Sequence, residues 1–251
     1  MPVYDKSGNP LLPKSVRELV ITSANRYTAS LSGVQSAFVT PSGKVWMMTE
    51  SSCYVVNNGV LIATITLGHT VGHANTTNYD NGYAYVSDWT DGQTIHVFEV
   101  DDDNNTLTYV KDITVPTTHG RTQFWVFDNE NQIYSCGWDY EHSENSQYMV
   151  VELWKKERDG DYVKSWESTA MGITMVQGMC VYNGRMYIID NTNAYKHLGI
   201  VIVDLASGVQ KYDASQTGTI LTLESEAIFP IGNDQFICVT HNGSQFTLTQ
   251  S

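Results

Sequence analysis

Short runs of alternating apolar and polar residues, separated by turn residues, extend along almost the whole chain. Cys53–Val56 and Leu61–Thr66, for example, flank the tripeptide Asn57-Asn58-Gly59. Alternation with a period of two and Asn-Gly turns are typical of β-hairpins. Apolar residues at helical spacing are almost absent. The pattern therefore predicts an all-β protein.

The predicted strands form a repeat. In each unit, a first strand opens on a polar residue, and a second strand carries a large residue near its start. The large residues are Trp46, Tyr85, Tyr134, Tyr187 and Ile237. The first strands open on Gln35, His73, His119, Gln177 and Glu226. Each unit holds four strands in about 40–50 residues, the size of a β-propeller blade.

The last unit has room for only three strands after Glu226, and residues 18–22 offer the missing one. A strand from the N-terminal end would close the ring and remove its open edges. We therefore expect a five-bladed β-propeller with four-stranded blades, its last blade closed by an N-terminal strand. Residues 16–251 would form this single domain, and residues 1–15 a lead-in segment. A β-sandwich is the alternative, but it gives no reason for a five-fold repeat.

Charge and composition exclude several classes of function. Asp and Glu number 27 against 14 Lys and Arg, giving a formal net charge of −13. A chain this acidic, with no basic cluster, is unsuited to nucleic acid or to anionic lipid. No apolar run is long enough to span a membrane, and the first residues lack the apolar stretch of a secretory signal. We therefore expect synthesis in the cytoplasm without membrane insertion.

The four cysteines are far apart in the sequence and form no CxxC pair. They are Cys53, Cys136, Cys180 and Cys238. Such spacing favours reduced, buried thiols over a disulfide framework or a zinc site.

Several stretches carry a family resemblance. Residues 177–187 and 224–228 resemble the propellers of the NHL and gluconolactonase-like group. The segment 72–79, which contains Gly-His-Ala-Asn, is similar to a repeat of bacteriophage structural proteins and helveticin-like bacterial proteins, and residues 4–11 resemble spacers of phage tail and baseplate proteins. The resemblance implies a propeller, a place on a virion and contacts with other virion proteins. Gluconolactonase-type enzymes hold a divalent metal with Glu, Asn and Asp at the channel, and only some of those residue types recur here.

The residues that open the first strands are expected to line one end of the central channel. His73, His119 and Glu226 would hold Zn²⁺ or a similar divalent ion if they converge. Asn75 and Arg121 lie two residues further along and would point the same way. The alternative is a water-filled polar channel whose side chains bond one another.

The second strands end at the same face, and their last residues offer further contacts. Trp89 and Trp138 occupy equivalent places in adjacent units, beside carboxylates. An exposed indole packs well on the C–H groups of a sugar, while Asp and Asn bind its hydroxyls. The alternative is that both indoles pack between blades. A third hypothesis is acid–base catalysis by a set of carboxyl groups: Asp88, Asp139, Asp190 and Glu226. The alternative is that the Asp residues are present because turns favour Asp.

These features favour a non-enzymatic binding module for a carbohydrate or cell-surface polymer, such as a bacteriophage receptor-binding or tail-associated protein. Its ligand-binding residues would be His73, Asn75, Trp89, His119, Arg121, Trp138, Gln177, Asp190, Glu226 and His241. No catalytic residue is assigned, and a divalent metal in the channel is the one candidate cofactor. The alternatives are a metal-assisted hydrolase of lactonase or glycosidase type, and a structural adaptor in a virion or complex.

Overall fold

The structure is a computed structural model of the chain. It describes residues 19–27, 30–90, 92–115, 124–129, 131–138, 149–168, 176–190, 199–206, 210–213 and 224–250. The predicted lead-in, residues 1–15, lies outside the described residues. Among those described, no helix is long and apolar enough to cross a membrane.

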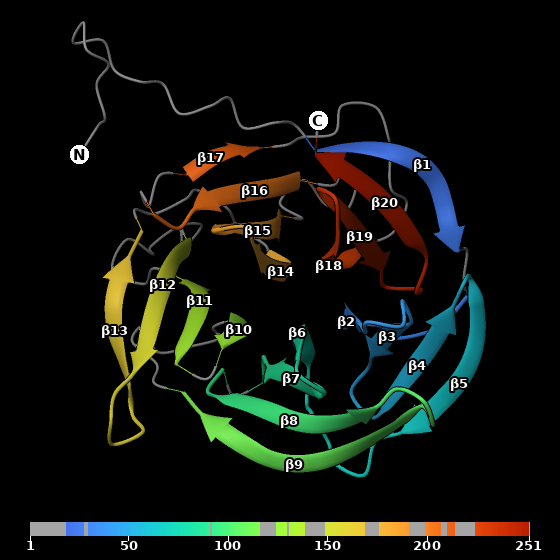
Figure 1. Ribbon diagram of the computed structural model, residues 1–251, viewed down its shortest axis with the longest axis horizontal. Helices are drawn as coiled ribbons and strands as arrows, with labels where there is room; N and C mark the ends of the chain where they lie inside the picture. Colours follow the sequence, from blue (N-terminus) through green and yellow to red (C-terminus); the bar gives the residue numbers. More distant parts are fainter. Residues whose placement is uncertain are drawn as a thin grey trace, which may run out of the picture.

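The described strands form five four-stranded antiparallel sheets arranged as a ring, which is a β-propeller (Figure 1). The first blade consists of β2 (Ser36–Val39), β3 (Val45–Met48), β4 (Ser52–Asn57) and β5 (Val60–Thr66). The second consists of β6 (Ala74–Asp80), β7 (Tyr83–Asp88), β8 (Thr94–Asp101) and β9 (Thr106–Thr114). The third consists of β10 (Phe124–Asn129), β11 (Gln132–Trp138), β12 (Met149–Lys156) and β13 (Tyr162–Glu167). The fourth consists of β14 (Val176–Tyr182), β15 (Arg185–Asp190), β16 (Gly199–Asp204) and β17 (Gln210–Asp213).

The fifth blade joins the two ends of the chain. Its strands are β18 (Ser225–Gly232), β19 (Gln235–Thr240), β20 (Gln245–Gln250) and β1 (Leu19–Tyr27). Strand β1 pairs antiparallel with β20, from Leu19 opposite Gln250 to Tyr27 opposite Gln245. This confirms the predicted closure, although the strand begins and ends later than residues 18–22.

Tight turns set the register of the blades. In the β4–β5 hairpin, Asn58 and Gly59 both have positive φ, at 47° and 76°. Positive φ at both central positions is what a two-residue hairpin turn requires, and Asn and Gly adopt it at low cost. Asn81-Gly82 and Asn183-Gly184 repeat this pattern. The sequence therefore places these hairpins by its turn residues alone.

The core lies between neighbouring blades. Four of the large second-strand residues are buried in it, and Tyr85 is half-buried; the four are Trp46, Tyr134, Tyr187 and Ile237. In the pairing register, Trp46, Tyr85, Tyr134, Tyr187 and Ile237 stand opposite Phe38, Asn78, Val126, Cys180 and Phe229. These five pairs are equivalent positions of the blades, which confirms the repeat. All four cysteines are free and buried, as expected, and burial raises the pKa of each thiol.

Candidate functional site at one end of the propeller axis

The inner strands β2, β6, β10, β14 and β18 surround the axis, and they begin at one end of it, here called the entry end (Figure 1). Three of them begin with an irregular pairing in which one residue is extra. Asn75, Gln177 and Glu226 are these extra residues of β6, β14 and β18. Such β-bulges re-aim a side chain and are common next to active sites. A β-bulge is therefore present at the start of three inner strands.

Gln35 occupies the equivalent position in the first blade. It lies three residues before Phe38, which pairs with Trp46, just as Asn75 lies three residues before Asn78, which pairs with Tyr85. Each of the four is a carboxamide or a carboxyl: Gln35, Asn75, Gln177 and Glu226. In the second blade the equivalent residue is therefore Asn75. The repeat in the sequence predicted His73, two residues earlier. His119 and Arg121, the third-blade candidates, lie outside the described residues.

Glu226 is the most buried acid of this end, with 1% of its surface exposed. Its Oε1 lies 3.0 Å from His241 Nδ1, while its Oε2 has no hydrogen-bond partner among the described residues. Burial raises the pKa of Glu226 to about 9, and the charge of Glu224 adds to the rise. At neutral pH the carboxyl therefore holds its proton.

Glu226 and Gln35 both approach one nitrogen of His241. Its Nδ1 lies 3.0 Å from Glu226 Oε1 and 3.4 Å from Gln35 Nε2. A protonated Glu226 carboxyl can donate to Nδ1 when the ring proton is on Nε2. Because the His241 side chain is 43% exposed, solvent reaches this pair.

Glu224 completes the group, which we call the axial cluster: Gln35, Gln177, Glu224, Glu226 and His241. Gln177 Nε2 donates to Glu224 Oε1. Burial raises the pKa of Glu224, while the bond from Gln177 and the charge of His241 oppose the rise. Ligand atoms of Glu224, Glu226 and His241 lie within 4.8 Å of one another.

The predicted metal trio of His73, His119 and Glu226 stays a prediction, because His119 lies outside the described residues. Among the described residues, Glu224 and His241 lie beside Glu226. Glu224 was not among the residues predicted from the sequence; it directly precedes β18 and lies two residues before Glu226.

His73 and Trp89 form the neighbouring part of the entry end. Their ring centroids are 5.4 Å apart, and Trp89 is 40% exposed, so it does not pack between blades. Burial lowers the pKa of His73, Glu50 and Asp88 act to raise it, and His241 acts to lower it. The electrostatic effect of His241 links this pair to the axial cluster.

Trp138 and Asp190 are the last residues of β11 and β15, and their side chains lie outside the described part of the structure. Asn75 is buried, and its Oδ1 has no partner among the described residues. An unsatisfied buried acceptor is costly, so a donor supplied by water or a ligand is expected there.

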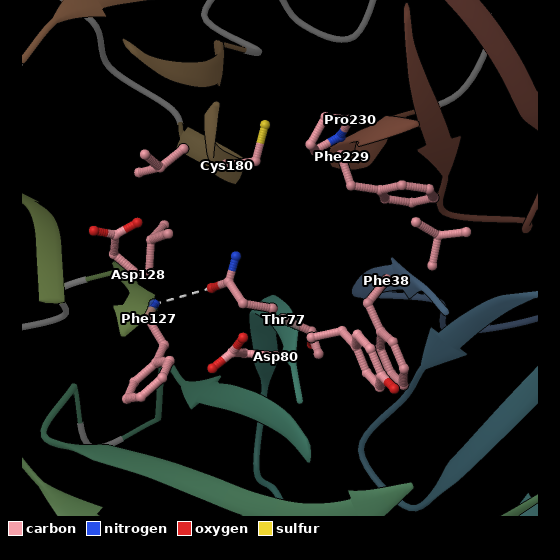
Figure 2. A pocket seen from close by; sticks show the side chains of 13 residues that line it. Phe38, Thr77, Asp80, Phe127, Asp128, Cys180, Phe229 and Pro230 are labelled. Atoms are coloured by element: carbon pink, nitrogen blue, oxygen red, sulfur yellow. Dashed lines mark hydrogen bonds between the residues drawn. The ribbon is translucent and has the colours of Figure 1, made fainter. Parts of the chain in front are cut away.

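A cavity of about 240 Å³ occupies the axis toward the other end of the inner strands. Figure 2 shows Asp80 and Asp128 pointing into it, with Cys180 and Pro230 on the far side. Asn78 Oδ1 accepts a hydrogen bond of 3.0 Å from the Phe127 backbone N–H across two blades. None of the site residues predicted from the sequence is among those that line this cavity.

The sequence matches no protein-family model and no curated protein. The fold is similar to solved structures. Glutaminyl cyclase of Myxococcus xanthus superposes with a TM-score of 0.62 at 13% identity, over 94% of this chain and 97% of that one. Hydrazine synthase of Kuenenia stuttgartiensis gives 0.42 at 14% identity, over 88% of this chain and 59% of that one.

A putative 6-phosphogluconolactonase of Bacteroides uniformis gives a TM-score of 0.42 at 10% identity, over 84% of this chain and 62% of that one. At these identities the likeness concerns the fold alone. The likeness to the Myxococcus xanthus protein agrees with the predicted propeller, while the phage-tail and helveticin-like resemblance stays a prediction.

Proposed function

We propose that the protein is an enzyme that catalyses acyl transfer on a small polar substrate at the entry end of the axis. Glu226 would be its general acid–base group. The observation that carries the proposal is the buried carboxyl of Glu226, whose Oε1 contacts His241 and whose Oε2 has no partner within the described part of the chain. A strongly shifted pKa at a solvent-reached cluster is typical of catalytic sites.

The chemistry needs one proton delivered and one removed. The attacking amine or water first adds to the acyl carbon and forms a tetrahedral intermediate. Neutral Glu226 donates its proton to the leaving nitrogen or oxygen as this intermediate collapses. The resulting carboxylate then takes the proton that the nucleophile brought, which restores the starting state. His241 orients the carboxyl through its 3.0 Å contact, and Gln35 holds His241 in turn.

Glycoside hydrolysis is less well supported. Its two carboxyl groups must flank the scissile bond on opposite sides of the sugar ring. Glu224 directly precedes β18 and Glu226 lies in it, with ligand atoms within 4.8 Å of one another. That separation is shorter than the roughly 5–5.5 Å between the two carboxyl groups of retaining glycosidases.

A carboxamide is the first substrate to test, because the protein from Myxococcus xanthus is named as a glutaminyl cyclase. The assay offers a peptide with an N-terminal glutamine, a set of small lactones, and aryl glycosides as the glycosidase arm. We expect turnover in one of the first two classes. Glu226→Gln should lower kcat/KM by about 10²–10⁴-fold, the usual contribution of a general acid.

Glu157→Gln is the matched control, because Glu157 is exposed in the β12–β13 hairpin, away from the inner strands. It should leave kcat/KM unchanged. Absence of turnover in all classes by folded wild-type protein, or full activity of Glu226→Gln, would overturn the proposal.

Carbohydrate binding is the second candidate function, and the exposed ring of Trp89 beside His73 favours it. We expect Trp89→Ala to weaken binding to arrayed bacterial glycans or cell-wall polysaccharide about tenfold or more, through loss of stacking. Tyr83→Ala is the control, because Tyr83 is an exposed aromatic residue at the other end of β7. Equal binding by both variants would contradict this candidate. Attachment to a phage particle and contacts with virion proteins stay predictions.

A further inference from the structure

A second group of metal-binding side chains lies on the outer part of the second blade, away from the axis. His69 is in the connection between β5 and β6, His96 is in β8, and Asp112 is in β9. His69 Nε2 lies 3.2 Å from His96 Nδ1 and 3.9 Å from Asp112 Oδ1. His96 Nδ1 lies 2.7 Å from Asp112 Oδ1. Three donor atoms from three segments thus converge on one point.

These distances suit one kind of ion. Ligands held about 2.0–2.2 Å from a tetrahedral Zn²⁺ stand roughly 3.3–3.6 Å apart. The three separations fall on both sides of that range, so small side-chain rotations would bring them into it. We infer that His69, His96 and Asp112 form a Zn²⁺ site, with water as the fourth ligand. His69 and Asp112 are partly exposed, at 29% and 41% of their side chains, so an ion can enter.

The surroundings position the ligands. His96 Nε2 lies 3.4 Å from Asp88 Oδ2. A carboxylate on the far nitrogen of a histidine fixes the ring and directs the other nitrogen toward a metal. The ring of Tyr109 stacks on His69 at 4.0 Å, with an interplanar angle of 17°. Both imidazoles are therefore held before an ion arrives.

The donor set also explains why zinc should prefer this place to the axial cluster. Two imidazoles and one carboxylate are common zinc ligands. In the axial cluster, Glu226 holds a proton that a metal would first have to displace. Binding at the outer site would tie the connection between the first two blades to strands β8 and β9. The ion would therefore stabilise the ring rather than serve the acyl-transfer site, and the inference does not rest on the proposed function.

Zinc must compete with protons at this site. Burial acts to lower the pKa of His96, but its hydrogen bonds with Asp88 and Asp112 outweigh burial and raise it. His69 and Tyr109 also face the group. Because the metal needs unprotonated ring nitrogens, zinc affinity should fall in acid.

The experiment titrates Zn²⁺ into the chelator-treated full chain by calorimetry, with thermal unfolding measured in parallel. We expect one site, and a Tm about 5–10 °C higher at a hundredfold excess of Zn²⁺ over its Kd. His69→Gln and Asp112→Asn should each weaken zinc binding by about 100-fold or more and abolish the Tm shift. Both residues are partly exposed, so both variants should fold, which circular dichroism checks.

His241→Gln serves as the matched control, because it removes the histidine of the axial cluster and should leave zinc binding unchanged. Unaltered zinc affinity in His69→Gln and Asp112→Asn would overturn the inference. So would loss of zinc binding in His241→Gln alone, which would assign the ion to the axial cluster.

Discussion

Two buried carboxyl groups, those of Glu152 and Glu226, differ in how their oxygens are hydrogen-bonded. Glu152 is fully buried, and its oxygens accept bonds from Lys164 at 3.2 Å and from Trp154 at 3.1 Å. Glu226 is buried to the same degree, but one of its oxygens meets no partner among the residues that the structure describes, and its pKa is raised to about 9. A satisfied buried acid stabilises a blade, whereas Glu226 weakens the fold at high pH. Such a cost is expected where a group serves a reaction.

The raised pKa of Glu226 predicts how stability varies with pH. The folded chain keeps the proton up to about pH 9, while the unfolded chain releases it near 4.5. The stabilising contribution is fully present below pH 4.5 and is lost as the pH rises through 9. Between these values the free energy of unfolding should fall by on the order of 1 kcal/mol per pH unit because of this group.

Glu226→Gln cannot titrate, so its urea unfolding curves should show a shallower decline over the same pH range. Glu157→Gln should behave as the wild type. Parallel pH profiles for the wild type and Glu226→Gln would contradict the assignment.

At the scale of elements, the inner strands show what the sequence can predict. The Asn-Gly turns predicted hairpins, and the large residues predicted the blade repeat. Both predictions were possible because these features depend on local sequence. The bulges could not be predicted, since an extra residue in a strand leaves no mark on the alternation. The second-blade position consequently moved from His73 to Asn75. The cluster of His69, His96 and Asp112 was missed because three separate segments build it.

The approach of β14 to β18 gives a prediction at this scale. A Cβ on Gly178 would lie 2.6 Å from the backbone oxygen of Glu226 and 3.0 Å from Ala227 Cα. Gly178→Ala must push the two inner strands apart, at a cost of about 1–3 kcal/mol in unfolding free energy. Gly68→Ala is the control, because nothing lies within 4 Å of its Cβ position. Chemical denaturation compares the two, and equal stability would refute the close approach.

At the scale of the whole molecule, the ring depends on the pairing of β1 with β20. A chain lacking residues 1–27 would expose β20 as an open edge, which favours association between chains. We expect this truncation to lower the Tm by more than 10 °C, or about 3 kcal/mol or more, and to promote aggregation. A chain lacking only residues 1–15, the predicted lead-in, should unfold like the full chain. Equal Tm values for the two truncations would show that β1 does not hold the ring.

The acid–base role of Glu226 rests on one property that can be observed directly, its protonation at neutral pH. An NMR titration of the ¹³C-labelled glutamate carboxyl carbons, in the wild type and in Glu226→Gln, would measure it. We predict one resonance that titrates near pH 9 and is missing from Glu226→Gln. If every glutamate carboxyl titrates below about pH 6, Glu226 is ionised at neutral pH and the proposed proton transfer is wrong.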